Sequence, residues 1–265
     1  MKNLVVVRGA GDIASGVIQK LHRCGFPVVA LEVENPSFIR RKVCFGEAIY
    51  DGTMEIEGSR ARYTQDPEEA MEICKGGEIA ILVDPQGESI ERLRPMAVVD
   101  AILAKKNYGT RRAMAPITIG LGPGFEAGKD VDIAVETMRG HDLGRLIFQG
   151  KPRENTGVPG VVGGYGRERV IYSEGEGIIV NKRKIGDIVE KGEVVANIGD
   201  VEVRAPLGGV IRGLIRNSYN VKKGLKIGDI DPRREQVENC FTISDKARNI
   251  GGAVLEGILI LRGGY

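Results

Sequence analysis

Short apolar runs alternate with amphipathic segments through the first 120 residues of the chain. Leu4–Val7 and Pro27–Val33 are largely apolar runs on either side of an amphipathic stretch, Val17–Cys24. Glu78–Val83 and Pro116–Ile119 repeat the apolar pattern further along. Strands that alternate with helices are typical of an open, mostly parallel sheet. We therefore predict an α/β fold with an N-terminal Rossmann-like, mostly parallel sheet.

The pattern changes after residue 120. Val131–Thr137 and Gly144–Phe148 predict two strands of a β-hairpin, and a glycine-rich connector follows them. Residues 170–233 hold an internal repeat, in which Gly177–Val180 recurs 32 positions later as Gly209–Arg212. Two such β halves resemble the barrel-sandwich hybrid of biotinyl and lipoyl domains. Carriers of that fold display a lysine at the hairpin tip, which this chain lacks, so we expect an interaction or scaffold module.

Two further segments predict helices. Pro95–Lys106 predicts one in the first part of the chain, and Ser244–Leu261 predicts a helix that packs back on another domain. The predicted domains are therefore a Rossmann-like nucleotide- or cofactor-binding domain with a hairpin extension (1–168), a barrel-sandwich-hybrid-like domain without the carrier lysine (169–233), and a C-terminal helix (234–265).

Composition limits the classes of function. The chain has 265 residues, of which 38 are basic and 36 acidic, for a formal net charge of +2. This near balance, without a basic face interleaved with aromatic residues, gives no indication of nucleic-acid binding. Four cysteines and two histidines show no metal-binding spacing and no disulfide framework. No apolar run approaches 18 residues, so we expect neither a membrane span nor a signal peptide, and a cytoplasmic protein.

The first glycine turn, Gly9, Ala10, Gly11, Asp12 and Ile13, is the leading candidate for a binding site. Glycines between a strand and a helix permit a tight turn, and the helix N-terminus then presents free N–H groups to a phosphate. An acidic residue after the second strand, Glu32 or Glu34, lies at the right distance for a ribose hydroxyl, and we assign Glu34 to this role. The alternative is a strand–turn–helix unit that binds nothing.

Two more loops follow predicted strands and are expected to face the same crevice. They supply Asp84 after the run that ends at Val83, and Gly122 and Gly124 in a second glycine loop that would wrap a phosphate with its N–H groups. In the turn that follows, Arg139 and Arg145 are natural partners for phosphate or carboxylate. His141 would act as an acid–base group, or would instead hold its loop closed through a carbonyl.

A basic segment around Cys44 is the second candidate for chemistry. In an extended conformation, alternation would place Arg40, Lys42 and Cys44 on one face. Two cations beside a thiol favour the thiolate, which is the nucleophilic form. The alternative is a small buried residue, with the basic side chains solvated or bound to phosphate.

Long strings of the sequence carry a resemblance to a known family: VRGAGDIASGV, IRRKVCFGEAIYDG, GLGPGFEAGKDVDIAVETMRGHDLGR, NTGVPG and DKARNIGGAVLEGIL. Over nearly its whole length the chain resembles the YqeB-type accessory proteins of the selenium-dependent molybdenum hydroxylase system, which are related to xanthine dehydrogenase accessory factors. The resemblance implies an accessory protein that assists maturation of a hydroxylase, and not the hydroxylase itself.

The resemblance also implies ligands and partners. A molybdopterin-type molybdenum cofactor would be held by the glycine loops, while Cys44 beside Arg40 and Lys42 would meet the metal end or deliver selenium. A molybdenum hydroxylase and a sulfur or selenium transferase are the implied partners, and the chain leaves room for a homo-oligomer. The alternative is an NAD(P)-dependent oxidoreductase that uses the same glycine loop, with His141 as its candidate acid. A third hypothesis is a structural adaptor with a vestigial nucleotide site.

Overall fold

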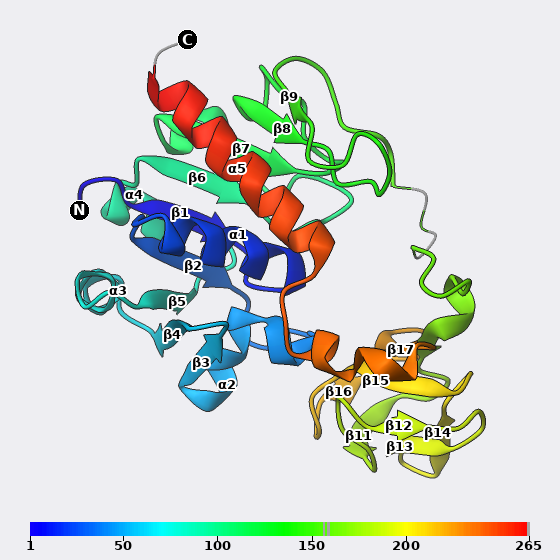
Figure 1. Cartoon of the computed structure of the whole chain (residues 1–265). Coiled ribbons are helices and arrows are strands. Elements are labelled where there is room, and N and C mark those ends of the chain that lie inside the picture. The colour runs from blue at the N-terminus through cyan, green and yellow to red at the C-terminus, as the bar shows by residue number, and fades with distance from the viewer. Residues whose placement is uncertain (156, 158–159, 264–265) are drawn as a thin grey trace. The chain divides into compact units, whose positions relative to one another are not determined.

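The computed structural model describes residues 1–155, 157 and 160–263 (Figure 1). The chain divides into two compact units. Unit 1 consists of Met1–Pro36, Cys44–Asn155 and Ile243–Tyr265. Unit 2 consists of Ser37–Val43 and Thr156–Thr242. The chain therefore leaves unit 1 twice and returns to it twice.

A nine-stranded mixed sheet forms the centre of unit 1, in the order β3-β4-β5-β2-β1-β6-β7-β8-β9. The seven strands from β4 to β8 in this order pair in parallel, whereas β3 and β9 are antiparallel edge strands. The bounds are β1 Val5–Arg8, β2 Val28–Glu32, β3 Thr53–Ile56, β4 Ser59–Thr64, β5 Ile79–Val83, β6 Ala97–Asp100, β7 Ile117–Leu121, β8 Ile133–Val135 and β9 Leu146–Ile147.

Helices cover both faces of this sheet. The longer ones are α1 (Asp12–Arg23) and α5 (Asp245–Gly263), which lie on one face (Figure 1). The other face carries α3 (Pro67–Lys75) and α4 (Ser89–Leu93), and α2 (Ala48–Asp51) precedes β3. Successive side chains of a strand point to opposite faces. Val7 accordingly belongs to the apolar cluster with α1 and α5, and Val6 to the cluster with α3 and α4.

Unit 2 contains two four-stranded antiparallel sheets, in the orders β10-β17-β15-β12 and β14-β13-β11-β16. The strands are β10 Val170–Tyr172, β11 Gly177–Asn181, β12 Ile188–Val189, β13 Val194–Ile198, β14 Val201–Arg204, β15 Gly209–Leu214, β16 Asn220–Val221 and β17 Lys226–Asp231. The two copies of the sequence repeat exchange partners, because β11 pairs with β16 and β12 pairs with β15. Alternate apolar residues such as Ile179, Val210 and Ile230 form a core of their own.

The predicted fold class is wrong and needs correction. The large sheet is mixed, and the connections from β6 to β7 and from β7 to β8 contain no α-helix, whereas a Rossmann-like sheet was expected to be crossed by helices. Unit 2 is not clearly a biotinyl- or lipoyl-like module. It contains strand β10 outside the repeat, and it includes the distant segment Ser37–Val43, where the carbonyl of Ile39 accepts a hydrogen bond from the Leu214 amide (2.8 Å).

Two local predictions also fail. Pro95–Lys106 is not a helix, because Ala97–Asp100 forms β6, fully enclosed between β1 and β7. The Cys44 segment is not extended. Two 3₁₀ turns, Arg41–Val43 and Phe45–Glu47, flank Cys44 and destroy the alternation on which the shared face depended.

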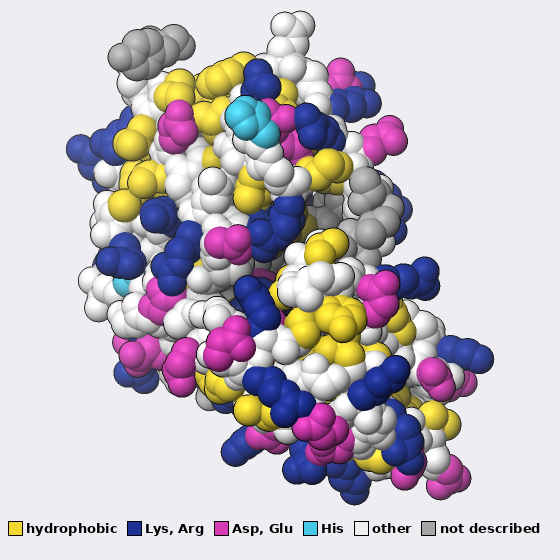
Figure 2. Space-filling view, turned by 45° about the vertical axis from the view of Figure 1, so that its right-hand side comes forward, with side chains coloured by type: hydrophobic (Ala, Val, Ile, Leu, Met, Phe, Trp, Pro, Cys, Tyr) yellow, Lys and Arg dark blue, Asp and Glu magenta, His cyan; other side chains and the backbone are white. Residues whose placement is uncertain are grey.

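Basic and acidic side chains are interspersed over the visible face of the molecule (Figure 2). Among the described residues, none of the helices is long and apolar enough to cross a membrane.

Candidate functional site

Charged residues end three adjacent strands of the nine-stranded sheet. Arg8 ends β1, Glu32 ends β2 and Asp100 ends β6, and the parallel register places Arg8 directly beside Asp100. Ligands of open α/β sheets bind outside the carboxyl ends of the strands, so this edge is where a site is expected.

Arg8 and Asp100 form a buried ion pair that joins the loops at this edge. Both side chains are about 2% exposed, and Arg8 Nη1 lies 3.6 Å from Asp100 Oδ2. The Thr110 hydroxyl accepts from Arg8 Nη1 (2.5 Å) and donates to Asp100 Oδ2 (2.6 Å). Arg8 Nη2 also donates to the carbonyls of Pro85 (3.0 Å) and Tyr108 (3.1 Å). Burial raises the pKa of Asp100, although Thr110 and Arg8 oppose the shift. The arginine is thus fully engaged in holding loops together.

The first glycine turn is closed by a carboxylate of the chain itself. Gly9 has φ +99°, and a Cβ there would lie 3.0 Å from the Ala101 carbonyl oxygen. The Ala10 amide donates to Glu32 Oε2 (2.8 Å), and burial raises the pKa of this carboxyl. Gly11 is the N-cap of α1 and supplies no side-chain cap to the turn that contains Asp12 and Ile13. An anion at Ala10 would have to displace Glu32, while Glu34 is exposed and its role for ribose stays a prediction.

Asp84 acts as a cap for its own loop. Its carboxylate accepts hydrogen bonds from the amides of Gly87, Glu88 and Ser89, at 2.8 to 3.0 Å, and from the Ser89 hydroxyl at 2.6 Å. Burial alone would raise the pKa of Asp84, but these hydrogen bonds outweigh it and hold the pKa below its ordinary value. The side chain therefore fixes the start of α4.

The second glycine loop is shaped by close packing. A Cβ at Gly122 would lie 2.6 Å from the Thr137 hydroxyl oxygen, and a Cβ at Gly124 would lie 3.0 Å from the backbone of Lys106. Both glycines have positive φ, so the loop needs them whether or not it binds a ligand.

The turn after β8 contains the other predicted basic residues. Arg139 donates to both carboxylate oxygens of Asp245 at the start of α5 (2.8 and 3.0 Å). His141 is exposed in the same turn. Burial lowers the pKa of the neighbouring Lys246, and Arg139 adds to this effect. Arg139 is therefore held by a carboxylate of the chain rather than left free for a ligand.

The structure does not place the predicted thiol cluster on one face. Arg40 belongs to unit 2, where its guanidinium donates to the carbonyls of Asn239 (3.0 Å) and Thr242 (3.3 Å). Lys42 is exposed, and Cys44 belongs to unit 1 with 1% of its surface exposed. The proposed reactivity of Cys44 stays a prediction.

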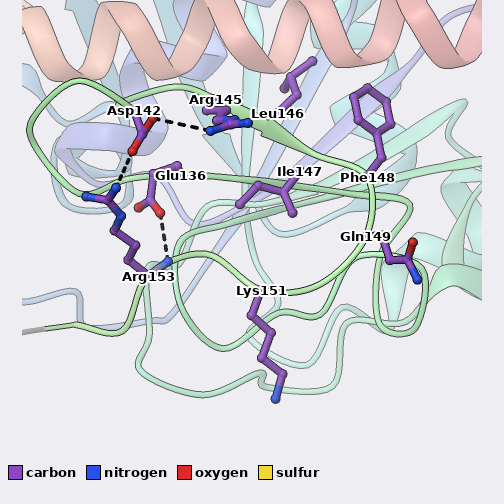
Figure 3. Close-up of a pocket in the computed structure, with 9 residues that line it drawn as sticks. All are labelled: Glu136, Asp142, Arg145, Leu146, Ile147, Phe148, Gln149, Lys151 and Arg153. Carbon is purple, nitrogen blue, oxygen red and sulfur yellow. Dashed lines mark hydrogen bonds and ion pairs between the residues drawn. The ribbon is translucent and has the colours of Figure 1, made fainter.

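A cavity of about 390 Å³ lies beside edge strand β9, in unit 1 (Figure 3). Its lining consists of Glu136, Asp142, Arg145, Leu146, Ile147, Phe148, Gln149, Lys151 and Arg153. Arg145 and Arg153 approach Asp142 from two sides (Figure 3). Arg145 Nη1 lies 3.6 Å from the Asp142 carboxylate, and Arg153 donates a short hydrogen bond to it.

The second acid of the cavity is already satisfied by backbone. Glu136 is buried, with Oε1 accepting from the Met138 amide (2.7 Å) and Oε2 from the Arg153 amide (2.8 Å). Two of the three basic residues of the lining, Arg145 and Arg153, thus face the Asp142 carboxylate, which is 21% exposed, whereas Lys151 Nζ lies 3.5 Å from Glu126 Oε2. The remaining wall is apolar, and Phe148 keeps 53% of its surface exposed.

Sequence reasoning named only Arg145 among the residues that line this cavity. The missed signal is the run from Arg145 to Arg153, RLIFQGKPR, in which three basic residues flank an apolar core of three. Asp142 carries no such signal, because its partners are set by the hairpin that brings Arg153 back beside the turn.

No protein-family model matches the chain. A curated protein of Escherichia coli named "Uncharacterized protein YqeB" is 52% identical over 259 residues, which are 97% of this chain and 48% of that protein. The chain thus spans about half the length of the curated relative that it matches. This similarity supports the YqeB family name and gives no link to a molybdenum hydroxylase.

Solved structures that resemble the chain do so distantly. They include the ectoine utilization protein EutE (DoeB) from Ruegeria pomeroyi (11% identity, 80% of this chain and 61% of that one, TM-score 0.25). They also include an aspartoacylase family protein from Mesorhizobium loti (12% identity, 86% of this chain and 84% of that one, TM-score 0.29). A succinylglutamate desuccinylase from Silicibacter is similar at the same level (14% identity, 86% of this chain and 84% of that one, TM-score 0.26). At such TM-scores these proteins carry no argument about what this chain binds.

The comparisons do not bear out the predicted function. None of the names reported above refers to molybdenum, selenium or NAD(P), so the comparisons give no support to a role in molybdenum hydroxylase maturation or to its oxidoreductase alternative, and neither is retained. The Rossmann assignment is wrong because the sheet is mixed and its connections from β6 to β7 and from β7 to β8 contain no α-helix. The names mention no cofactor and no partner protein. The predicted molybdenum cofactor and the predicted partner proteins therefore remain untested.

Proposed function

We propose that unit 1 binds a small organic anion in the cavity beside β9. The ligand has a carboxylate or phosphate group joined to an apolar, flat body. The observation that carries this proposal is the charge of the lining: it contains three basic residues, Arg145, Lys151 and Arg153, but only two acids, and one of these, Glu136, is already bonded to two backbone amides.

The arginines supply the anion site. Arg145 is 72% exposed, and its Nη1 lies 3.6 Å from the Asp142 carboxylate, which is too far for a tight hydrogen bond. Its guanidinium can therefore turn to a ligand without breaking one. Guanidinium groups bind carboxylate and phosphate through two parallel N–H donors. Glu136 does not repel the ligand strongly, because two backbone amides already neutralise its charge in part.

The apolar lining residues determine which ligand body fits beside the anionic group. Leu146, Ile147 and Phe148 follow one another along and beyond the edge strand, and the Phe148 ring lies at the end of the cavity away from Asp142 (Figure 3). An exposed aromatic ring offers a flat surface on which another ring can stack. A volume of about 390 Å³ suits a ligand of this size.

The test is a titration of the isotopically labelled chain, followed by NMR, with phenylacetate, phenyl phosphate and the neutral analogue phenylacetamide. A charge-assisted hydrogen bond is worth about 1.5–3 kcal/mol, so at least one anion should bind about tenfold or more tightly than the amide. The comparison of the two anions identifies the preferred group. Shifts should centre on residues 145–153.

Two variants and a matched control complete the experiment. Arg145→Gln should reduce the affinity for the anions to that for phenylacetamide, and Phe148→Ala should weaken all three ligands. Arg62→Gln removes an exposed arginine of β4 from its ion pair with Glu78 and should leave binding unchanged. Equal affinity for charged and neutral ligands, or no binding, would overturn the proposal.

A further inference from the structure

A second cavity in unit 1, of about 960 Å³, lies between α4 and the loop that leads into β7. It shares no residue with the cavity beside β9. Its charged lining residues are Glu88, Glu91, Arg94 and Arg111, and its apolar ones include Ile90, Pro95 and Met114. From this lining we propose that the cavity binds a zwitterionic ligand of the amino-acid or dipeptide class.

The four charges are available to a ligand. Among the residues that the structure describes, none of these side chains forms an ion pair or a side-chain hydrogen bond, although Arg92 on the same short helix pairs with Glu68 at 2.9 Å. Two carboxylates and two guanidinium groups therefore line one hollow without neutralising each other. A ligand with an ammonium and a carboxylate matches both signs, whereas a simple anion or cation would meet repulsion from one pair.

The cavity also has an anchored aromatic residue. Tyr108 is 54% exposed, while its backbone carbonyl accepts a hydrogen bond from the buried guanidinium of Arg8 (3.1 Å). The same guanidinium nitrogen also donates to the Pro85 carbonyl (3.0 Å), next to Gln86 and Gly87 of the lining. One buried side chain thus ties together two segments of the lining, and such preorganisation lowers the cost of binding a ligand.

The ligand size follows from the volume and the wall. Ligand cavities of about 300–1,000 Å³ hold molecules of drug or dipeptide size. The Tyr108 ring and the Met114 thioether favour an aromatic or large apolar side chain. The proposal does not depend on the anion site beside β9, since no lining residue is common to both cavities.

The test uses L-alanyl-L-phenylalanine, its N-acetyl form and its C-terminal amide, titrated into the labelled full chain. The free dipeptide should bind, and removal of either charge should weaken binding about tenfold or more. Glu91→Gln should weaken the free dipeptide and the amide but leave the N-acetyl form unchanged. Arg111→Gln should weaken the free dipeptide and the N-acetyl form but leave the amide unchanged.

Two more variants separate recognition from folding. Tyr108→Ala should weaken all three ligands by a similar factor. Arg92→Gln changes a neighbouring charge on α4 that does not line the cavity, and it should bind all three ligands like the parent chain. Since Glu91 and Arg111 are exposed, thermal unfolding should match the parent for both variants. Equal affinities for the three ligands, no detectable binding, or variants without this charge-specific pattern would each refute the proposal.

Discussion

Gly251 on α5 packs directly against Gly16 on α1. A Cβ at Gly251 would lie 2.5 Å from the Gly16 carbonyl oxygen, and a Cβ at Gly16 would lie 2.5 Å from the carbonyl oxygen of Ala247. The two helices therefore meet backbone to backbone. Their contact covers the face of the sheet that carries Val7 and Ile119.

The first prediction concerns this helix contact. Gly251→Ala inserts a methyl group where no space exists, and overpacking of this kind costs about 1–3 kcal/mol. The midpoint of urea unfolding should fall accordingly. Gly252→Ala is the matched control, because a Cβ there meets nothing within 4 Å. The Gly252→Ala variant should be more stable than the parent by about 0.5–1 kcal/mol, because alanine has a better helix propensity than glycine. Similar effects of the two substitutions would contradict the packing described here.

A second prediction concerns the buried ion pair of Arg8 and Asp100. Asp100→Asn leaves the guanidinium buried without a countercharge, which costs about 3–5 kcal/mol. The double variant Arg8→Met/Asp100→Leu should lose less than this, because no charge stays buried. Glu68→Gln, which breaks the exposed pair with Arg92, should cost about 1 kcal/mol or less. Chemical denaturation of the parent chain and the three variants measures these losses of stability. A double variant that is less stable than Asp100→Asn would show that the loss does not come from the buried charge.

The third prediction is a pH dependence that originates in Asp84. Its pKa is lower in the folded chain, so its contribution to stability is fully present above the unfolded pKa of about 3.9 and disappears as the pH falls through the folded pKa. Asp84→Asn should cost about 1–2 kcal/mol at pH 7, as the loss of a capping residue does. It should also flatten the fall in stability below about pH 4. Glu72→Gln on α3, an exposed acid, should retain the acid limb of the parent chain.

A fourth prediction concerns thiol reactivity. Cys24 is exposed, whereas Cys44, Cys74 and Cys240 are buried, and burial raises the pKa of Cys74 and of Cys240 to about 11. Only a thiolate reacts readily with a disulfide reagent. The native chain should therefore show one fast thiol, which Cys24→Ser removes, and four thiols in urea. A fast phase that Cys44→Ser removes would instead support the reactive role expected from the sequence.

Sequence patterns predicted elements well where a run was both long and apolar. Glu78–Val83 became β5 within one residue, and Ser244–Leu261 became α5. Ala97–Asp100 was missed because its apolar run is short and Pro95 before it is also a common helix-start signal. What decided its structure was burial between β7, the next strand along the chain, and β1, which is distant in sequence.

The site was less predictable than the elements. Glycines at Gly9 and Gly122 were recognised, but a glycine pattern does not distinguish a turn that binds an anion from one that packs against backbone. The bond from Ala10 to Glu32 depends on the register of two strands, and the Asp142–Arg153 pair depends on a hairpin. Local propensity carries no information on either contact.

The position of α5 has a consequence for synthesis. Unit 1 begins at the N-terminus, yet the helix that covers α1 and the adjoining face of its sheet begins only at Asp245, after all the strands of unit 2. During translation, α1 therefore emerges from the ribosome more than 200 residues ahead of its packing partner. The surface of α1 around Gly16 therefore lacks its α5 partner until unit 2 has been synthesised.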